Sequence, residues 1–180
     1  NFNDMTTAIG SLSTSGMKLE DSVSVVKGFY NLAAGTGVDA SRASSLLQTA
    51  MIQAINLGKM DYQNWKQLEM QGMGGPKFKE ALIANAKAMG KNVDLSKSFN
   101  ESLRDGWATT DVLLATMRQF ETDKSLLSAA QDVRTFTQLM GTARESVVSG
   151  WARTWEIVVG DFNEATTLWS GVHAAIEPII

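Results

Sequence analysis

Apolar residues recur every three or four positions along most of this chain, which is the period of an amphipathic α-helix. A first helix opens at the acidic pair Glu20-Asp21, whose charge complements the helix dipole, and is interrupted at Gly35-Thr36-Gly37. A second helix begins at a cap supplied by Asp39 or Ser41 and ends at Gly58. The predicted inward faces are Val23, Val26, Tyr30 and Ala33 in the first helix, and Ala43, Leu46, Leu47, Ala50, Met51, Ala54 and Ile55 in the second.

A glycine followed by a capped helix then occurs twice. GKMDYQNWKQL runs from Gly58 to Leu68, and GWATTDVLLATM runs from Gly106 to Met117. Asp61 is the predicted cap of the first helix, and Thr109 or Thr110 is the predicted cap of the second. We expect the inward residues to be Trp65 and Leu68 in the first helix, and Val112, Leu113, Thr116, Met117 and Phe120 in the second.

The segment between these two units supplies further helices. QGMGGP interrupts the chain, and Pro76 suits the first turn of a helix that stops at Gly90. Asp94 is the predicted cap of a short helix through Phe99 and Leu103. The predicted inward residues of the helix after Pro76 are Phe78, Leu82, Ala86 and Met89. Strand and hairpin signals are missing, so the predicted fold class is all-α.

The predicted organisation has three parts. Residues 1–17 form a helical lead-in, residues 18–122 form a compact domain of five or six short helices, and residues 123–180 form a helical stem. In the stem, apolar residues alternate at intervals of three and four from Val148 to Ile176, which is a heptad seam that faces a partner helix. The predicted helix-packing interface is Val148, Trp151, Trp155, Val158, Phe162, Trp169 and Val172. Its glycines and bulky tryptophans predict that the stem bends, packs against the domain or joins a larger assembly.

Composition narrows the function classes. The net charge of −3 disfavours a nucleic-acid surface, since duplex affinity depends mainly on lysine and arginine at phosphates. The absence of cysteine excludes a disulfide scaffold, a thiolate metal site and a cysteine nucleophile. The best candidate for a membrane span, residues 43–58, is too short and contains Gln48, Gln53 and Asn56. Because the chain begins at Asn1 without an initiator methionine, we expect it to be a piece of a longer polypeptide.

Candidate chemistry is sparse. The glycines at 72–75 lack the preceding strand and the hydroxyl residue of a phosphate-binding loop, because Phe78 takes the latter position, so we interpret them as a helix breaker. His173 is the only histidine, which leaves a metal site dependent on carboxylates. The carboxylate pairs Glu20/Asp21 and Glu121/Asp123 are predicted to lie at helix starts. We therefore predict no catalytic, cofactor-binding or metal-binding residue.

The order of these motifs resembles the conserved N-terminal region of bacteriophage tail tape measure proteins. GKMDYQNWKQL, a glycine-containing turn ending in proline, a helix closing on AKAMGK (Ala86 to Lys91) and DGWATTDVLLATM follow one another as in that family. The stretch from Thr142 to Trp169 is similar to the family's continuation, and the resemblance covers residues 18–176. QGMGGP departs from the family's pattern because it contains more glycine than the usual turn.

This resemblance implies a structural protein without enzymatic activity or cofactor. Several copies would extend along the lumen of the growing tail while tube subunits polymerise around them, which sets tail length, and they would leave ahead of the DNA. The implied partners are the tail tube protein, tail assembly chaperones and other copies of the chain, without a specific nucleic acid. The implied location is the virion tail, assembled in the host cytoplasm, with membrane contact only through parts of the full protein outside this chain.

Two further interpretations of the residues stay open. Short helices joined by glycine turns can mimic helix-turn-helix units, so the chain could be a helical protein-interaction or DNA-binding module, although its acidic charge disfavours DNA. Some tape measure proteins carry peptidoglycan-cleaving domains, which makes a muralytic domain the other alternative. A glycosidase requires two carboxylates across a cleft, and the sequence offers no convincing pair on a loop.

Overall fold

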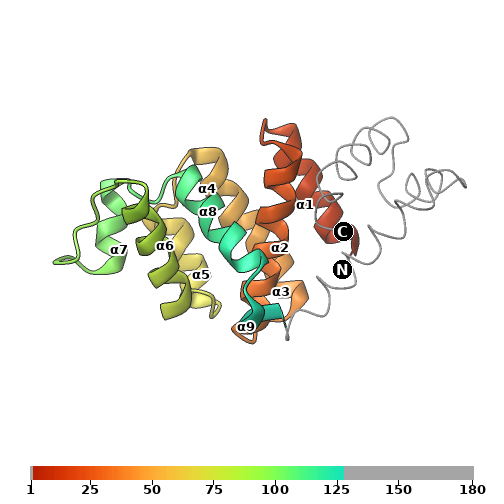
Figure 1. Ribbon diagram of the computed structural model, residues 1–180. Helices are drawn as coiled ribbons and strands as arrows, with labels where there is room; N and C mark the ends of the chain where they lie inside the picture. Colours follow the sequence, from red (N-terminus) through yellow and green to blue (C-terminus); the bar gives the residue numbers. More distant parts are fainter. Residues whose placement is uncertain (1, 128–180) are drawn as a thin grey trace, which may run out of the picture.

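The computed structural model describes residues 2–127, and this part of the chain folds as helices joined by short turns, without a strand (Figure 1). The helices are α1 (Phe2–Thr14), α2 (Leu19–Gly35), α3 (Ala40–Leu46), α4 (Ile52–Leu57), α5 (Tyr62–Met70), α6 (Pro76–Ala88), α7 (Phe99–Ser102), α8 (Thr110–Glu121) and α9 (Lys124–Leu127). A π-helical turn, η1 (Leu47–Met51), joins α3 to α4, and a 3₁₀ turn, η2 (Leu103–Asp105), follows α7. The predicted all-α fold class is confirmed for these residues.

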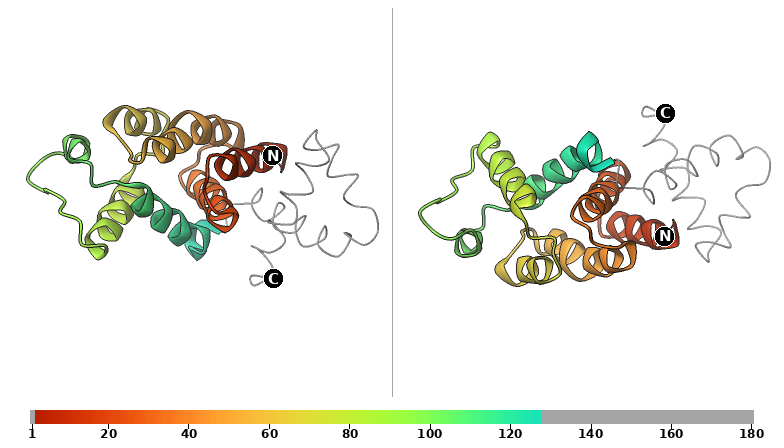
Figure 2. Two further views of the ribbon diagram at one scale, coloured as in Figure 1. Left: turned by 90° about the horizontal axis from the view of Figure 1, so that it is seen from above. Right: turned by 90° about the horizontal axis from the view of Figure 1, so that it is seen from below.

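Helix α2 lies at the centre of the domain. Every residue from Ser22 to Ala33 is buried, so this helix is covered on all sides. Helices α1, α3, α8 and α9 all contact it, and both views of Figure 2 show α8 crossing between α2 and α6. At Gly28 the backbones of α2 and α8 lie against each other, because an added Cβ would lie 2.1 Å from the backbone carbonyl oxygen of Met117. Only glycine permits the two backbones to approach this closely.

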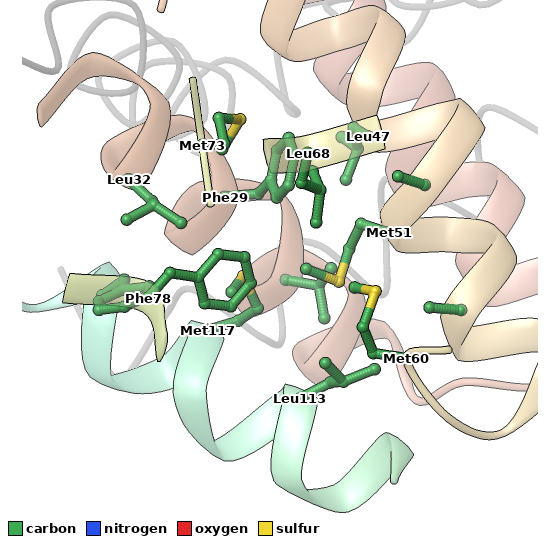
Figure 3. Packing of buried hydrophobic residues seen from close by; sticks show 14 of the residues in the cluster. Phe29, Leu32, Leu47, Met51, Met60, Leu68, Met73, Phe78, Leu113 and Met117 are labelled. Atoms are coloured by element: carbon green, nitrogen blue, oxygen red, sulfur yellow. The ribbon is translucent and has the colours of Figure 1, made fainter. Parts of the chain in front are cut away.

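A single hydrophobic core joins the helices. Figure 3 shows side chains from α2, η1, α5, α6 and α8, and from the turns beside them, pointing toward one another; the labelled members are Phe29, Leu32, Leu47, Met51, Met60, Leu68, Met73, Phe78, Leu113 and Met117. The same cluster contains Met5, Ala8, Ile9 and Leu12 of α1 and Leu126 of α9. The predicted lead-in and the start of the predicted stem therefore contribute to the core of the compact domain.

The predicted inward faces are confirmed with one exception. All the predicted residues of α2, of α3 to α4, of α5 and of α8 are buried, as are Phe78, Leu82 and Ala86 of α6. Met89 is 43% exposed, so its predicted burial is wrong. Met89 is the C-cap of α6, where the backbone turns away from the face that packs against α8.

Most predicted helix boundaries are also confirmed. The carboxylate of Asp39 accepts the N–H of Arg42, and that of Asp61 accepts the N–H of Asn64, each at 2.8 Å. Asp94 does not cap a helix, because its carboxylate accepts both the N–H and the hydroxyl of Ser96 in a local turn. Ser98 is the residue that caps α7. The local Asp-x-Ser hydrogen bonds hold the chain in a turn, so the helix begins after Ser98.

Candidate functional site

The predicted helix-packing interface, Val148, Trp151, Trp155, Val158, Phe162, Trp169 and Val172, lies outside the described residues. Within residues 2–127, no three histidine, aspartate or glutamate side chains gather closely enough to hold a metal ion. In the same part of the chain, no helix combines the length and the apolar character that crossing a membrane requires. The strongest candidate site is instead structural, at the point where α8 ends and the chain continues toward residue 128.

A buried amide closes the end of α8. The Nδ2 of Asn31, on α2, donates to the carbonyl oxygen of Phe120 at 3.0 Å and to that of Glu121 at 3.2 Å. The last carbonyls of a helix lack partners within the helix itself, so a side-chain donor from another helix stabilises this terminus. Asn31 is fully buried, and its position on the rigid central helix fixes where α8 stops.

A largely buried ion pair lies beside this amide. The Nζ of Lys27 is 3.6 Å from Oε1 of Glu121, and the two side chains are only 9% and 10% exposed. Glu121 was predicted to lie at a helix start, and that prediction is wrong because it is the last residue of α8. A carboxylate there opposes the helix dipole, and the Lys27 ammonium offsets that unfavourable charge. Arg118 pairs with Asp21 one turn away, so two ion pairs join α2 and α8.

Asp123 organises the next turn. Its Oδ1 accepts the N–H of Ser125 at 2.9 Å and the Ser125 hydroxyl at 2.6 Å, so it lies at the start of α9, as predicted. The Nζ of Lys77, in the first turn of α6, is 2.9 Å from Oδ2 of Asp123 and donates to the Ser125 hydroxyl at 3.1 Å. The Ser125 hydroxyl bond and then the Lys77 bond hold the pKa of the Asp123 carboxyl below its ordinary value.

A hydrophobic contact completes the attachment. Leu126 of α9 is buried against Gly35, where an added Cβ would lie 2.1 Å from its Cδ2 atom. Lys27, Asn31 and Gly35 are spaced four residues apart, so they share one face of α2. We call this face, together with Lys77 and residues 120–126, the exit junction. It can fix the position of residues 120–126 on the domain, because both polar and apolar contacts hold this segment.

The two glycine-led units also meet in space. The N–H of Met60 donates to the carbonyl oxygen of Ala108 at 2.8 Å, and the N–H of Thr110 donates to that of Gly58 at 3.1 Å. Gly58 and Gly106 both have left-handed backbone conformations, with φ of 97° and 78°. Each is followed three residues later by an N-cap, Asp61 or Thr109. The carboxylate of Asp61 caps the first helix, whereas the Thr109 side chain accepts no helix N–H. The repeated unit is thus a glycine turn before a helix, and backbone hydrogen bonds hold the two copies together.

The glycine cluster at 72–75 separates two helices, as predicted. Gly72 adopts φ of 92° just after α5, and Pro76 begins α6. Gly74 lies against the backbone of Glu69, where an added Cβ would approach the Cα of that residue to 2.7 Å. The lysine that follows, Lys77, is engaged with Asp123 and Ser125 at the exit junction.

The sequence interpretation did not identify the exit junction. Asn31 and its partner carbonyls are 89 and 90 residues apart, a separation that hydrophobic periodicity does not address. One signal was present, because Lys27, Asn31 and Gly35 interrupt the most apolar part of a predicted helix at intervals of four. Polar residues inside a buried helix require partners, and their common spacing indicates a single partner segment.

Comparisons with protein-family models, with curated proteins and with solved structures gave no match.

Proposed function

We propose that this chain is part of a bacteriophage or prophage tail tape measure protein. In this role residues 2–127 form a folded anchor, and the chain beyond residue 127 belongs to the part that extends along the tail. The proposed partners are the tail tube protein, the tail assembly chaperones and other copies of the chain. The proposed location is the lumen of the tail tube, after assembly in the host cytoplasm.

The observation that carries this proposal is the ordered set of glycine-led motifs. Gly58 and Gly106 occupy equivalent places before Asp61 and Thr109, and backbone hydrogen bonds join the two units. Two of the motifs on which the resemblance rests therefore lie side by side, although they are separated in the sequence. This supports treating them as a single signature instead of several unrelated short matches.

The exit junction supports the structural side of the proposal. A protein that sets a length needs a firm attachment between its fixed end and its extended part. Lys27, Asn31, Gly35 and Lys77 hold residues 120–126 against α2 and α6. Such an attachment suits a domain that anchors a following segment, because the exit point does not depend on a free loop.

We also propose that the chain has no reaction of its own. A groove of about 320 Å³ between α2 and α8 is lined by both Glu20 and Glu121, and a muralytic enzyme would need two carboxylates in such a groove. Glu121 is held by Lys27 in the ion pair that joins these helices, which favours a packing role. Cell-wall hydrolysis that is lost in the Glu121→Gln variant would contradict this proposal.

The proposal is tested on tails purified from the phage or induced prophage that encodes the chain. Quantitative mass spectrometry should find its peptides in intact tails at several copies per tail. In a separate sample of intact virions, their amount should fall after DNA ejection is triggered, because the chain leaves the tube ahead of the DNA. A capsid protein serves as the purity control and should be absent from isolated tails. Tails of normal length without these peptides would overturn the proposal.

A further inference from the structure

Two cationic side chains lie over the ring of Tyr62 at the start of α5, and a third, Lys59, lies against the nearby turn at Gly106. The guanidinium carbon of Arg104, in η2, lies 5.4 Å from the centre of the Tyr62 ring, and the Nζ of Lys66 lies 5.9 Å from it. The Lys59 side chain passes close to Gly106, with its Cδ 3.9 Å from where an added Cβ would be. We call these four residues, Lys59, Tyr62, Lys66 and Arg104, the Tyr62 patch. Lys66 and Arg104 are exposed, and the ring orients their charged groups.

The neighbouring carboxylates have other partners. Asp61 uses its carboxylate to cap α5, and Asp105 is bound by Lys97 at 3.0 Å. Lys59, Lys66 and Arg104 form no ion pair with a carboxylate of residues 2–127. The planar guanidinium of Arg104, held over an aromatic ring, is a suitable bidentate donor to a carboxylate.

The complementary charge lies elsewhere in the same sequence. Of the sixteen lysines and arginines, three lie beyond residue 127, whereas six of the nineteen aspartates and glutamates do. The net charge of −3 therefore belongs to residues 128–180. No lysine or arginine follows Arg153, and Glu156, Asp161 and Glu164 come directly after it. All charged residues of segment 154–164 are thus acidic.

We propose that the Tyr62 patch binds the acidic segment 154–164 of a second copy of this chain. Figures 1 and 2 place α7, and η2 directly after it, at the end of the domain away from α9, where the described chain ends. Arg104 belongs to η2, so the patch reaches this end of the domain. Such a contact joins two different surfaces and links copies head to tail. The inference stands on charge and position, and it does not require the proposed function.

The test measures self-association of the full chain by sedimentation velocity, over a range of protein and salt concentrations. The unmodified chain should associate, and added salt should weaken association because exposed charges are screened. The double variant Lys66→Glu, Arg104→Glu should raise the dissociation constant at least about tenfold, since two attractions become repulsions. The double variant Glu156→Lys, Glu164→Lys should do the same.

Mixing the two double variants gives the decisive result. In each variant alone, the patch and the segment carry charges of the same sign and repel each other. In the mixture, the acidic patch of the first variant can bind the basic segment of the second, and the unmodified patch of the second can bind the unmodified segment of the first. Association should therefore return in the mixture, which an intrachain contact does not predict. Lys87→Glu, at an exposed lysine of α6, is the control and should associate like the unmodified chain.

Three outcomes would overturn the inference. The first is an unmodified chain that stays monomeric. The second is a mixture that associates no better than its components, and the third is a Lys87→Glu variant as weak as the patch variant. Thermal unfolding of each variant checks that the substitutions leave the fold intact. Lys66 and Arg104 are exposed, so their replacement should not disturb the core.

Discussion

At Gly28, the two central helices touch backbone to backbone. Replacing Gly28 with alanine places a methyl group 2.1 Å from the carbonyl oxygen of Met117, so α2 and α8 must separate. We expect the free energy of unfolding to fall by about 1–3 kcal/mol, as for other overpacked cores. Urea unfolding followed by circular dichroism measures the change.

Gly10 provides a matched control for this prediction. It lies inside α1, and an added Cβ there meets nothing within 4 Å. Gly10→Ala should raise the free energy of unfolding by about 0.5–1 kcal/mol, because alanine loses less backbone entropy in a helix. Equal effects of the two substitutions would mean that helix propensity, and not the close approach of α2 to α8, decides the outcome at Gly28.

A second prediction at the residue scale concerns Asn31. Asn31→Ala removes the donor that satisfies the carbonyls of Phe120 and Glu121, so we expect a loss of about 1–3 kcal/mol. Hydrogen exchange should accelerate most in residues 120–126, because the exit junction opens before the core does. Asn56→Ala, at an exposed asparagine of α4, should change stability by less than about 0.5 kcal/mol. Unchanged hydrogen exchange in residues 120–126 of the Asn31→Ala variant would mean that Asn31 does not stabilise the exit junction.

At the scale of elements, α9 depends on an ionised Asp123. Its folded pKa lies below the ordinary value of 3.8, so it contributes stability above that pH and loses it as the pH falls through the folded pKa. We expect Asp123→Asn to weaken the protection of α9 amides at pH 7, and the difference from the unmodified chain should shrink as the pH falls below 3.8. Hydrogen exchange corrected for intrinsic rates measures this. A difference that does not shrink as the pH falls would contradict the role of the charge.

Helix identity and helix ends were predictable where the cause is local. In α2 to α4 and in α8, the apolar residues that recur every three or four positions are the buried ones. The sequence therefore predicted the buried face of each helix correctly. Asp39 and Asp61 were identified as caps because capping is satisfied within one turn. The prediction that Asp94 caps a helix was wrong for a related reason. Its carboxylate accepts hydrogen bonds from Ser96, two residues away, and not from the N–H groups of a helix start.

The junction was not predictable because its causes lie far apart in the sequence. Gly28 lies against the backbone of Met117, and Asn31 donates to the last carbonyls of α8, so both depend on a helix about 90 residues away. A periodic pattern shows that α2 is buried, but it does not show which helix covers each side. The sequence could have indicated that buried polar residues on α2 share a partner, without naming that partner.

At the scale of the whole molecule, the domain and the proposed ruler respond differently to deletion. Core residues come from α1 through α9, so removing 28 consecutive residues from 2–127 eliminates at least one packed helix. Such a deletion should prevent folding and block tail assembly, without a graded change in length. Loss of assembly alone would not distinguish a ruler from any other essential tail protein, so the informative deletion lies in the predicted stem.

Removing four heptads, 28 residues, from the predicted stem between residues 145 and 176 keeps the heptad register on both sides of the cut. A helix rises about 1.5 Å per residue, so a segment extended along the tail should shorten it by about 42 Å. Electron microscopy of tails from the modified phage measures that difference over many particles. A folded segment contributes only its diameter, so tails of unchanged length with normal assembly would place residues 145–176 outside the ruler. The chain would then act as an anchoring or folding module, and the exit junction would connect two folded parts of the protein.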